Sequence, residues 1–234
     1  MQNTKETFEE SVLLKEQPQS FSRRNFLTKA GAATLGSAII FNACKKDSGY
    51  VFTGGGTDLG SGDVGILNYA FALEQLEAAF YIQVAKTPYS GITAQETIYL
   101  TDIRDHEVAH REFFKTALGT SAIGTLSFNF SSVDFSSRAS VLGTAKALED
   151  TGVMAYNGAG QLLTDPGYLL LAGKIVSVEA RHAALLRDLI SNGTFADDLD
   201  SNALDINKTP SQILAIAGGF IVNASSIDAS HLPS

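Results

Sequence analysis

The chain has 234 residues, of which 44% are hydrophobic and 18% charged, enough for one ordinary globular domain with a sizeable core, or at most two small domains. It is too polar and too rich in glycine for a multi-span membrane protein, and its single cysteine excludes a disulfide framework or a thiolate metal cluster. The formal net charge of −8 argues against binding to nucleic acid, because phosphates attract basic surfaces.

The first 43 residues have the pattern of an export signal. Arg23 and Arg24 stand before an apolar segment that carries no charge from residue 30 to residue 43 and is too short to span a bilayer. This segment resembles a twin-arginine signal, which directs folded proteins out of the cytoplasm. We therefore expect residues 1–43 to be removed and the mature chain to reside in the periplasm or cell envelope.

The only cysteine, Cys44, follows Ala43 at the position where a lipobox places a lipidated cysteine. Two acyl chains suffice for a stable anchor, so we expect the mature chain to be a membrane-anchored lipoprotein. The alternative is a buried helix in which the arginine pair and the cysteine have no role in export.

Residues 44–63 are rich in Gly, Ser and Thr and are expected to form a flexible tether between the anchor and the folded domain. Within them and just beyond, residues 60–65 match G-x-G-x-x-G, a pattern that binds dinucleotides when it links a strand to a helix. No strand or βαβ unit is expected here, so we interpret these glycines as part of the linker.

Capping signals predict four helices and hence an all-α fold. Asp63 is expected to cap the first helix, and Thr93 and Glu96 form a capping box at the second. Asp165 is expected to cap the fourth helix, and Pro166 suits its first position. We expect the helices to span about residues 63–86, 93–118, 136–163 and 165–192, with Ser136 or Ser137 as the cap of the third.

The connections between these helices predict their arrangement. Two of the three loops are short, whereas residues 120–135 form a long connection that is expected to be extended. This pattern is typical of a four-helix bundle with one crossover, here over residues 64–193. Residues 194–234 form a C-terminal extension, in which the apolar segment 213–222 is expected to dock as an additional helix.

Two Glu-x-x-His motifs occur in the second and fourth predicted helices. Residues three apart lie on the same face of a helix, so each motif can direct a carboxylate and an imidazole to one point. The first and third helices each carry a glutamate on an apolar stripe. Together these four helices supply six candidate ligands: Glu74, Glu107, His110, Glu149, Glu179 and His182.

The spacing of these residues repeats between the two halves of the chain, as if one helical hairpin were used twice. Tyr81 stands seven residues after Glu74, and Tyr156 stands seven residues after Glu149. Each tyrosine is too far along the helix to reach its own glutamate but can face the interior. We expect both hydroxyls to donate hydrogen bonds across the bundle to carboxylates of other helices.

Carboxylate and imidazole ligands in this arrangement predict a site for two divalent metal ions. Such ligands suit Fe(II), Mn(II) or Zn(II), and four carboxylates neutralise two divalent cations. Without metal the same carboxylates would repel each other and lose hydration. The alternative is a set of solvated surface pairs, but glutamates on an apolar stripe are rarely buried unless they are paired or bind metal.

Weaker signals come from three single residues and one acidic segment. Glu77 could replace Glu74, join it as a seventh ligand, or form a salt bridge in the core; the spacing to Tyr81 favours Glu74. His106 is expected to be partly exposed, with a supporting role behind the metal ligands as the alternative, and His231 is expected to have no role. Residues 198–202 begin like a calcium loop but lack its glycine and final glutamate, so we interpret them as a solvated acidic loop.

Residues 66–189 resemble the ferritin-like superfamily, and most of all the exported ferritin-like domain proteins that include desiccation-related proteins. The segments that carry this resemblance are LEQLEAAFY (73–81), LEDTGVMAY (148–156) and VEARHA (178–183). The resemblance implies that the six candidates bind two Fe or Mn ions and that small oxidants are partners. Ferroxidases, peroxidases, manganese catalases and oxygenases share this site, so the reaction stays open.

Two functions remain open. The first is a di-iron or di-manganese oxidoreductase that consumes O2 or peroxide or oxidises Fe(II). The second is a metal-binding or stress-protective module with little turnover. A homodimer is compatible with the sequence, whereas a cage is not expected for a tethered chain with a long crossover.

Overall fold

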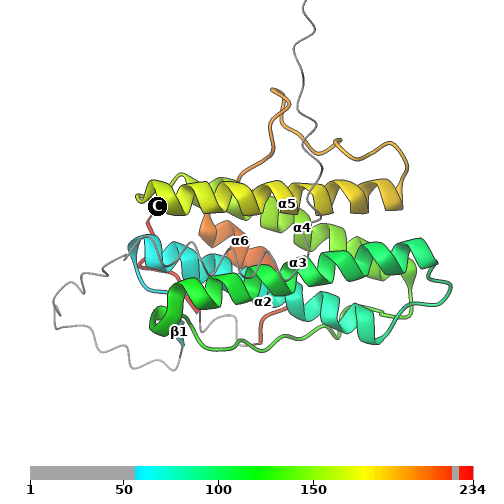
Figure 1. Cartoon of the computed structure of the whole chain (residues 1–234), viewed down its shortest axis with the longest axis horizontal. Coiled ribbons are helices and arrows are strands. Elements are labelled where there is room, and N and C mark those ends of the chain that lie inside the picture. Colours follow the sequence, from blue (N-terminus) through cyan, green and yellow to red (C-terminus); the bar gives the residue numbers. More distant parts are fainter. Residues whose placement is uncertain (1–55, 223–226, 234) are drawn as a thin grey trace, which may run out of the picture. The chain divides into compact units, whose positions relative to one another are not determined.

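The structure is a computed structural model that describes residues 56–222 and 227–233. The predicted export signal and Cys44 lie outside these residues. The described part is an all-α bundle, which confirms the predicted fold class (Figure 1). None of its helices combines the length and the apolar character that crossing a membrane requires.

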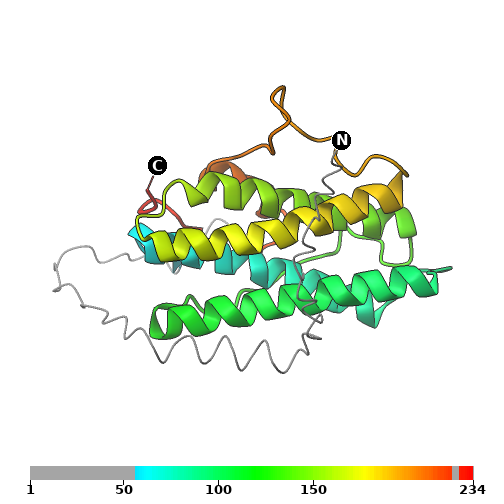
Figure 2. The same ribbon diagram turned by 45° about the horizontal axis from the view of Figure 1, so that its top comes forward.

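Four long helices form two antiparallel hairpins. They are α2 (Gly62–Lys86), α3 (Ala94–Leu118), α4 (Arg138–Gly160) and α5 (Pro166–Ile190). Helix α2 packs on α3, α4 packs on α5, and the two hairpins meet where α2 contacts α4 (Figures 1 and 2). A long crossover joins α3 to α4, as predicted for a bundle with one crossover. It begins with a short 3-10 helix, η1 (Gly119–Ser121).

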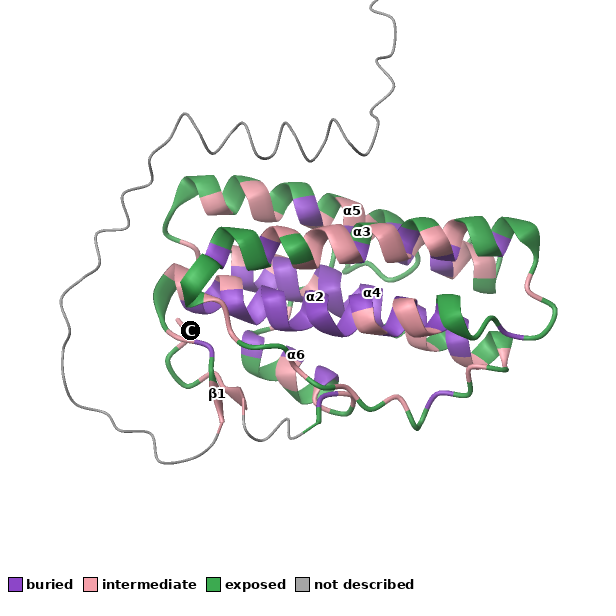
Figure 3. Ribbon diagram, turned by 60° about the horizontal axis from the view of Figure 1, so that its bottom comes forward, coloured by how far each residue is buried: buried purple, intermediate pink, exposed green. Residues whose placement is uncertain are grey.

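The core is concentrated along α2 and α4. Buried residues cover most of α2, whereas α3 and α5 are buried mainly on the stripe that faces the bundle (Figure 3). This difference follows from the packing, because α2 contacts both α3 and α4. Helix α2 also places two carboxylates, Glu74 and Glu77, among its buried residues.

The capping signals are observed at three of the four long helices. Thr93 and Glu96 form the predicted capping box, Ser137 rather than Ser136 caps α4, and Asp165 accepts a hydrogen bond from the Gly167 amide at the start of α5. The expected cap at Asp63 is wrong, because α2 begins at Gly62, one residue before Asp63, and Ser61 takes the cap position. The Asp63 carboxylate instead accepts hydrogen bonds from the loop between α4 and α5, including the amides of Thr164 and Asp165.

The predicted ends of α4 and α5 are each too late. Helix α4 ends at Gly160 instead of Leu163, because Leu162 and Leu163 already form tight turns whose amides donate to carbonyls three residues earlier. Helix α5 ends at Ile190 instead of Asn192, and the chain then turns through Gly193, which has a φ of 89°.

The crossover of residues 120–135 is irregular rather than extended. Among the described residues its one bridge to another segment joins Phe128 to Ile221. Polar side chains of α2 hold the crossover instead: Asn68 accepts from the Ile123 amide, and Gln75 accepts from the Leu126 amide. These side-chain bonds satisfy backbone groups that a strand would have paired.

The folded domain begins before residue 64, so the predicted tether is too long at its C-terminal end. Strand β1 (Thr57–Asp58) pairs in parallel with β2 (Ile227–Asp228), and Leu59 is fully buried. The glycines that follow have structural roles. Gly60 has a φ of 83°, and its carbonyl lies so close to Gly65 that a side chain at Gly65 would collide with it.

The C-terminal extension adds one helix, as predicted, but with different bounds. Helix α6 (Pro210–Ala217) packs on α4 and begins with a capping box formed by Thr209 and Gln212. The acidic segment before it folds back on itself, since Asp200 accepts hydrogen bonds from the amides of Asn202 and Leu204.

Candidate metal centre

The six predicted ligands converge in the middle of the bundle. They form two overlapping groups, and within each group one ligand atom from every residue lies within 4.8 Å of the others. The groups consist of Glu74, Glu107, His110 and Glu179, and of Glu107, Glu149, Glu179 and His182. Glu107 and Glu179 belong to both groups. Each group could hold a metal ion, and the shared carboxylates would lie between the two ions.

Each histidine directs its Nδ1 atom toward the carboxylates. The Nδ1 atom of His182 lies 2.9 Å from Oε1 of Glu107 and 3.1 Å from Oε2 of Glu149. The Nδ1 atom of His110 lies 2.9 Å from Oε1 of Glu179. This arrangement follows from the Glu-x-x-His spacing, because the histidine and glutamate of each motif share one face of α3 or α5.

The cluster is shielded from solvent. All four glutamates are 0% exposed, and His182 is 5% exposed. Charged side chains in such surroundings require compensation by pairing, by protonation or by a cation. The two histidines provide part of this compensation in the metal-free protein.

The pKa shifts in the cluster reflect this pairing. Burial raises the pKa of Glu74 to about 8. Burial alone would lower the pKa of His182, but hydrogen bonds to the surrounding carboxylates raise it to about 12. Burial would also raise the pKa of Glu179, but the two neighbouring histidines lower it to about 2. The protonated imidazoles thus supply positive charge to carboxylates whose charge divalent cations would otherwise balance.

Several buried ligand atoms accept or donate no hydrogen bond of good geometry within the described residues. They are Oε2 of Glu74, both carboxylate oxygens of Glu107 and of Glu179, and Nδ1 of His110. Leaving such atoms unsatisfied costs about 1–3 kcal/mol each, and more when they are charged. Coordination to a divalent cation would remove this cost, so the donor set fits metal ions.

Two tyrosines form hydrogen bonds across the bundle, as the repeated spacing predicts. The Tyr81 hydroxyl on α2 donates to Oε1 of Glu149 on α4 over 2.6 Å. The Tyr156 hydroxyl on α4 donates to Oε1 of Glu74 on α2. Each tyrosine therefore restrains the glutamate that belongs to the other half of the repeat.

His106 lies behind His182, although its ring is exposed. Its Nδ1 atom is 2.9 Å from Nε2 of His182, and the two rings are nearly parallel. A histidine that binds metal through Nδ1 commonly donates its other N–H to a fixed acceptor. The sequence left open a supporting role for His106 behind the metal ligands, and its contact with His182 favours that role.

Glu77 lies next to the cluster but, among the described residues, belongs to neither ligand group. Its carboxylate is buried beside Gly152 of α4, where a Cβ atom would stand 3.1 Å from Oε1 of Glu77. Burial and the neighbouring glutamates raise its pKa well above the usual range. This position favours Glu74 as the candidate ligand of α2.

One more acidic group includes His231. It consists of Asp58, Asp228 and His231, which are exposed or half-buried near the paired strands. The two aspartates already accept hydrogen bonds from nearby loop amides, Gly60 and Ser230. This group therefore has a structural explanation without metal.

Comparison with known families agrees with this geometry. A family model described as a ferritin-like domain matches residues 62–192. The chain belongs to the ferritin-like domain family. Comparison with curated proteins finds no match. The ferritin-like domain extends from the first residue of α2 to just beyond the end of α5, so it contains all six candidate ligands and excludes the C-terminal extension.

Proposed function

We propose that this ferritin-like protein binds two Fe or Mn ions between its four central helices and uses them in redox chemistry with a small oxidant. The observation that carries the proposal is the convergence of four fully buried glutamates around two histidines, with several glutamate oxygens that accept no hydrogen bond from the part of the chain that the structure describes. Apolar side chains would be more stable at these positions if the cluster had only a structural role.

The chain's own residues would hold and orient the ions. Glu107 and Glu179 would bridge them, with Glu74 and His110 on one side and Glu149 and His182 on the other. When bound, two such ions would supply electron exchange with O2 or peroxide. Tyr81 and Tyr156 would fix the orientation of the terminal carboxylates, and His106 would hold the ring of His182.

The proposal is tested by metal analysis of protein expressed with its leader in medium containing iron and manganese. We expect about two ions per chain and a loss of most of this metal in Glu107→Gln. The control is Glu112→Gln on the same helix, because Glu112 is exposed and pairs with its neighbour Arg111. Protein without metal, or equal metal in both variants, would contradict the proposal.

A non-catalytic metal-binding or stress-protective role is the second candidate. It is favoured by the complete shielding of the glutamates, which is compatible with a site that holds ions without turnover. Consumption of O2 and of H2O2 by the metal-loaded protein separates the two candidates. Turnover supports the redox enzyme, and a filled but inert site supports the second role.

We also propose that the protein is exported and anchored through a lipid on Cys44. The support lies in the sequence, in the arginine pair and in the position of the cysteine. Cys44→Ser should release the mature protein from membranes into the soluble envelope fraction, and Arg23→Lys with Arg24→Lys should block export. Wild-type protein recovered intact with Met1 from the cytoplasm would contradict this proposal.

A further inference from the structure

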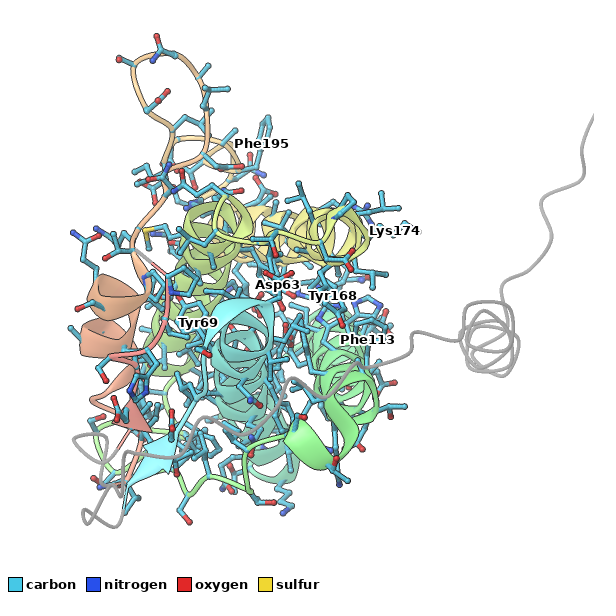
Figure 4. The ribbon with its side chains drawn as sticks, turned by 90° about the vertical axis from the view of Figure 1, so that its left-hand side faces the viewer. Asp63, Tyr69, Phe113, Tyr168, Lys174 and Phe195 are labelled. Carbon is cyan, nitrogen blue, oxygen red and sulfur yellow. The ribbon has the colours of Figure 1, made fainter. Side chains whose placement is uncertain are left out.

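An apolar cavity lies between the four long helices at one end of the bundle. We call it the end cavity; its volume is about 40 Å³. It lies where α2 and α5 begin and where α3 and α4 end, the end that faces the viewer in Figure 4. Phe113 and Tyr168, labelled there, line it from α3 and α5. A site for one water needs roughly 10–15 Å³ on this scale, so the end cavity has room for a small molecule.

The lining of the end cavity is chemically uniform. Apart from three tyrosines, every lining residue is Ala, Gly, Leu, Ile or Phe. Polar molecules need several hydrogen-bonding partners to enter such a space, and apolar cavities in proteins stay dry while taking up apolar guests such as xenon. The lining therefore selects small apolar molecules over water and peroxide.

The inner end of the end cavity lies beside the candidate metal centre, although none of the six candidate ligands lines it. Its inner lining includes Leu73, which precedes Glu74, and Ile175, which lies one turn before Glu179. Tyr156 also lines it, and the hydroxyl of this tyrosine donates to Glu74. The outer lining is formed by half-buried side chains at the helix ends, so the cavity leads from the end of the bundle toward the ligands.

The internal repeat shows how the sequence creates this space. The residue before Tyr81 is Phe80, whose ring packs edge-on against Tyr81 at 5.2 Å and fills its end of the core. The residue before Tyr156 is Ala155, which lines the end cavity. One turn further on, Ala159 stands where the first half has a valine. The second half of the repeat thus has small side chains where the first half has large ones.

We propose that the end cavity binds dioxygen and brings it to the side of the metal centre formed by Glu74 and His110. This inference rests on the proposed function and selects its oxidant, because an apolar path admits O2 and disfavours H2O2. The ring of Phe80 fills the core at one end of the bundle, and Ala155 has only a methyl group at the equivalent position of the other end. The metal centre is therefore reached by apolar molecules from one end.

The first test uses xenon on metal-free protein, so that it does not depend on the metal. Xenon under pressure, located in crystals or by NMR, should occupy the end cavity. Ala155→Phe, which copies the first half of the repeat, should abolish this occupancy, and the smaller change Ala159→Val should reduce it several-fold. Ala139→Val, an exposed position on the same helix, should leave it unchanged. Absence of xenon from the cavity of the wild type would overturn the inference.

The second test uses the metal-loaded variants. Ala159→Val should slow O2 consumption several-fold while the metal content and the rate with H2O2 stay at the wild-type level. Ala155→Phe should have a larger effect in the same direction if its unfolding temperature is unchanged. Equal slowing with both oxidants, or none with either, would overturn the inference. Failure to bind metal would overturn the proposed function instead, and the xenon result would identify which of the two is wrong.

Discussion

Single side chains decide how the carboxylates of the centre are oriented. Glu149 and Glu74 each accept a hydrogen bond from a tyrosine of the opposite helix, and both tyrosine hydroxyls are buried. Burial and the nearby glutamate charge raise the pKa of each tyrosine, so the hydroxyls keep their protons and remain donors. A donor that is always protonated stabilises the charged form of a carboxylate ligand.

The double variant Tyr81→Phe/Tyr156→Phe removes both hydroxyls and keeps the rings. We expect metal affinity to fall about 10–100-fold, because losing a partner of a metal ligand typically has this effect. Thermal unfolding of the metal-free protein should change little. Tyr99→Phe, on α3 and outside the cluster, is the control for metal titration. Unchanged affinity in the double variant would mean that the tyrosines serve only packing.

His106 provides a second prediction at this scale. His106→Leu removes the partner of His182 Nε2, and we expect it to lower metal affinity about 10–100-fold. In His106→Ala, free imidazole should restore part of the affinity, because the site of the lost ring is exposed. His231→Leu should have no effect in the same metal titration. Unchanged affinity in His106→Leu, or no recovery of affinity with imidazole in His106→Ala, would contradict a role of His106 in holding His182.

The helices are held in register by bonds between their ends. Arg138 at the start of α4 donates to Glu96 in the first turn of α3 over 2.6 Å, and it also donates to the Leu189 carbonyl near the end of α5. Glu96 in turn accepts from the Thr93 amide in the capping box. One carboxylate thus links a helix cap to a contact between the hairpins.

This link predicts a dependence of stability on pH. Burial would raise the pKa of Glu96, but the bonds from Thr93 and Arg138 lower it below the usual value. A carboxyl whose pKa is lower in the folded state stabilises the fold above its unfolded pKa, and this contribution is lost as pH falls through the folded pKa. Glu96→Gln should therefore cost about 1 kcal/mol at pH 7 and nearly nothing in strong acid. Denaturant unfolding at several pH values measures this; a cost independent of pH would contradict it.

Docking of the C-terminal extension depends on one glycine of α4. The Lys208 carbonyl lies so close to Gly158 that a Cβ atom there would collide with it. Gly158→Ala should displace this segment and cost about 1–3 kcal/mol in unfolding free energy. Gly143→Ala on the same helix meets nothing within 4 Å and should instead stabilise by up to about 1 kcal/mol. Chemical denaturation distinguishes the two; equal effects would contradict the account.

Local signals were sufficient to predict the four long helices and to place the glutamate and histidine of each Glu-x-x-His motif on one face, because caps and i, i+3 spacing act within one helix. The residues whose interpretation from the sequence is wrong depend on partners far away in the chain. Asp63 looks like a cap but binds a loop about a hundred residues away. Leu59 looks like linker but is buried. The partner of His182 depends on how α3 and α5 are rotated against each other, and no pattern within one helix specifies that rotation.

At the scale of the whole described domain, the four-helix bundle is a repeated hairpin with one modified end. Its two halves supply matched ligands and matched tyrosines, so the centre is nearly symmetric. The difference lies in the filling around the tyrosines, with Phe80 at one end and Ala155 at the other. The symmetric part would hold the two proposed ions, and the asymmetric part would provide the proposed access from one side.

The most direct test of the metal centre is anomalous scattering from crystals of the metal-loaded protein, measured at the iron and manganese edges. We predict two peaks about 3.5–4 Å apart. Both should lie between Glu107 and Glu179, with one beside His110 and the other beside His182. Crystals of metal-loaded protein that show no peak between the four long helices, or peaks only at surface groups such as Asp58 and His231, would contradict the account.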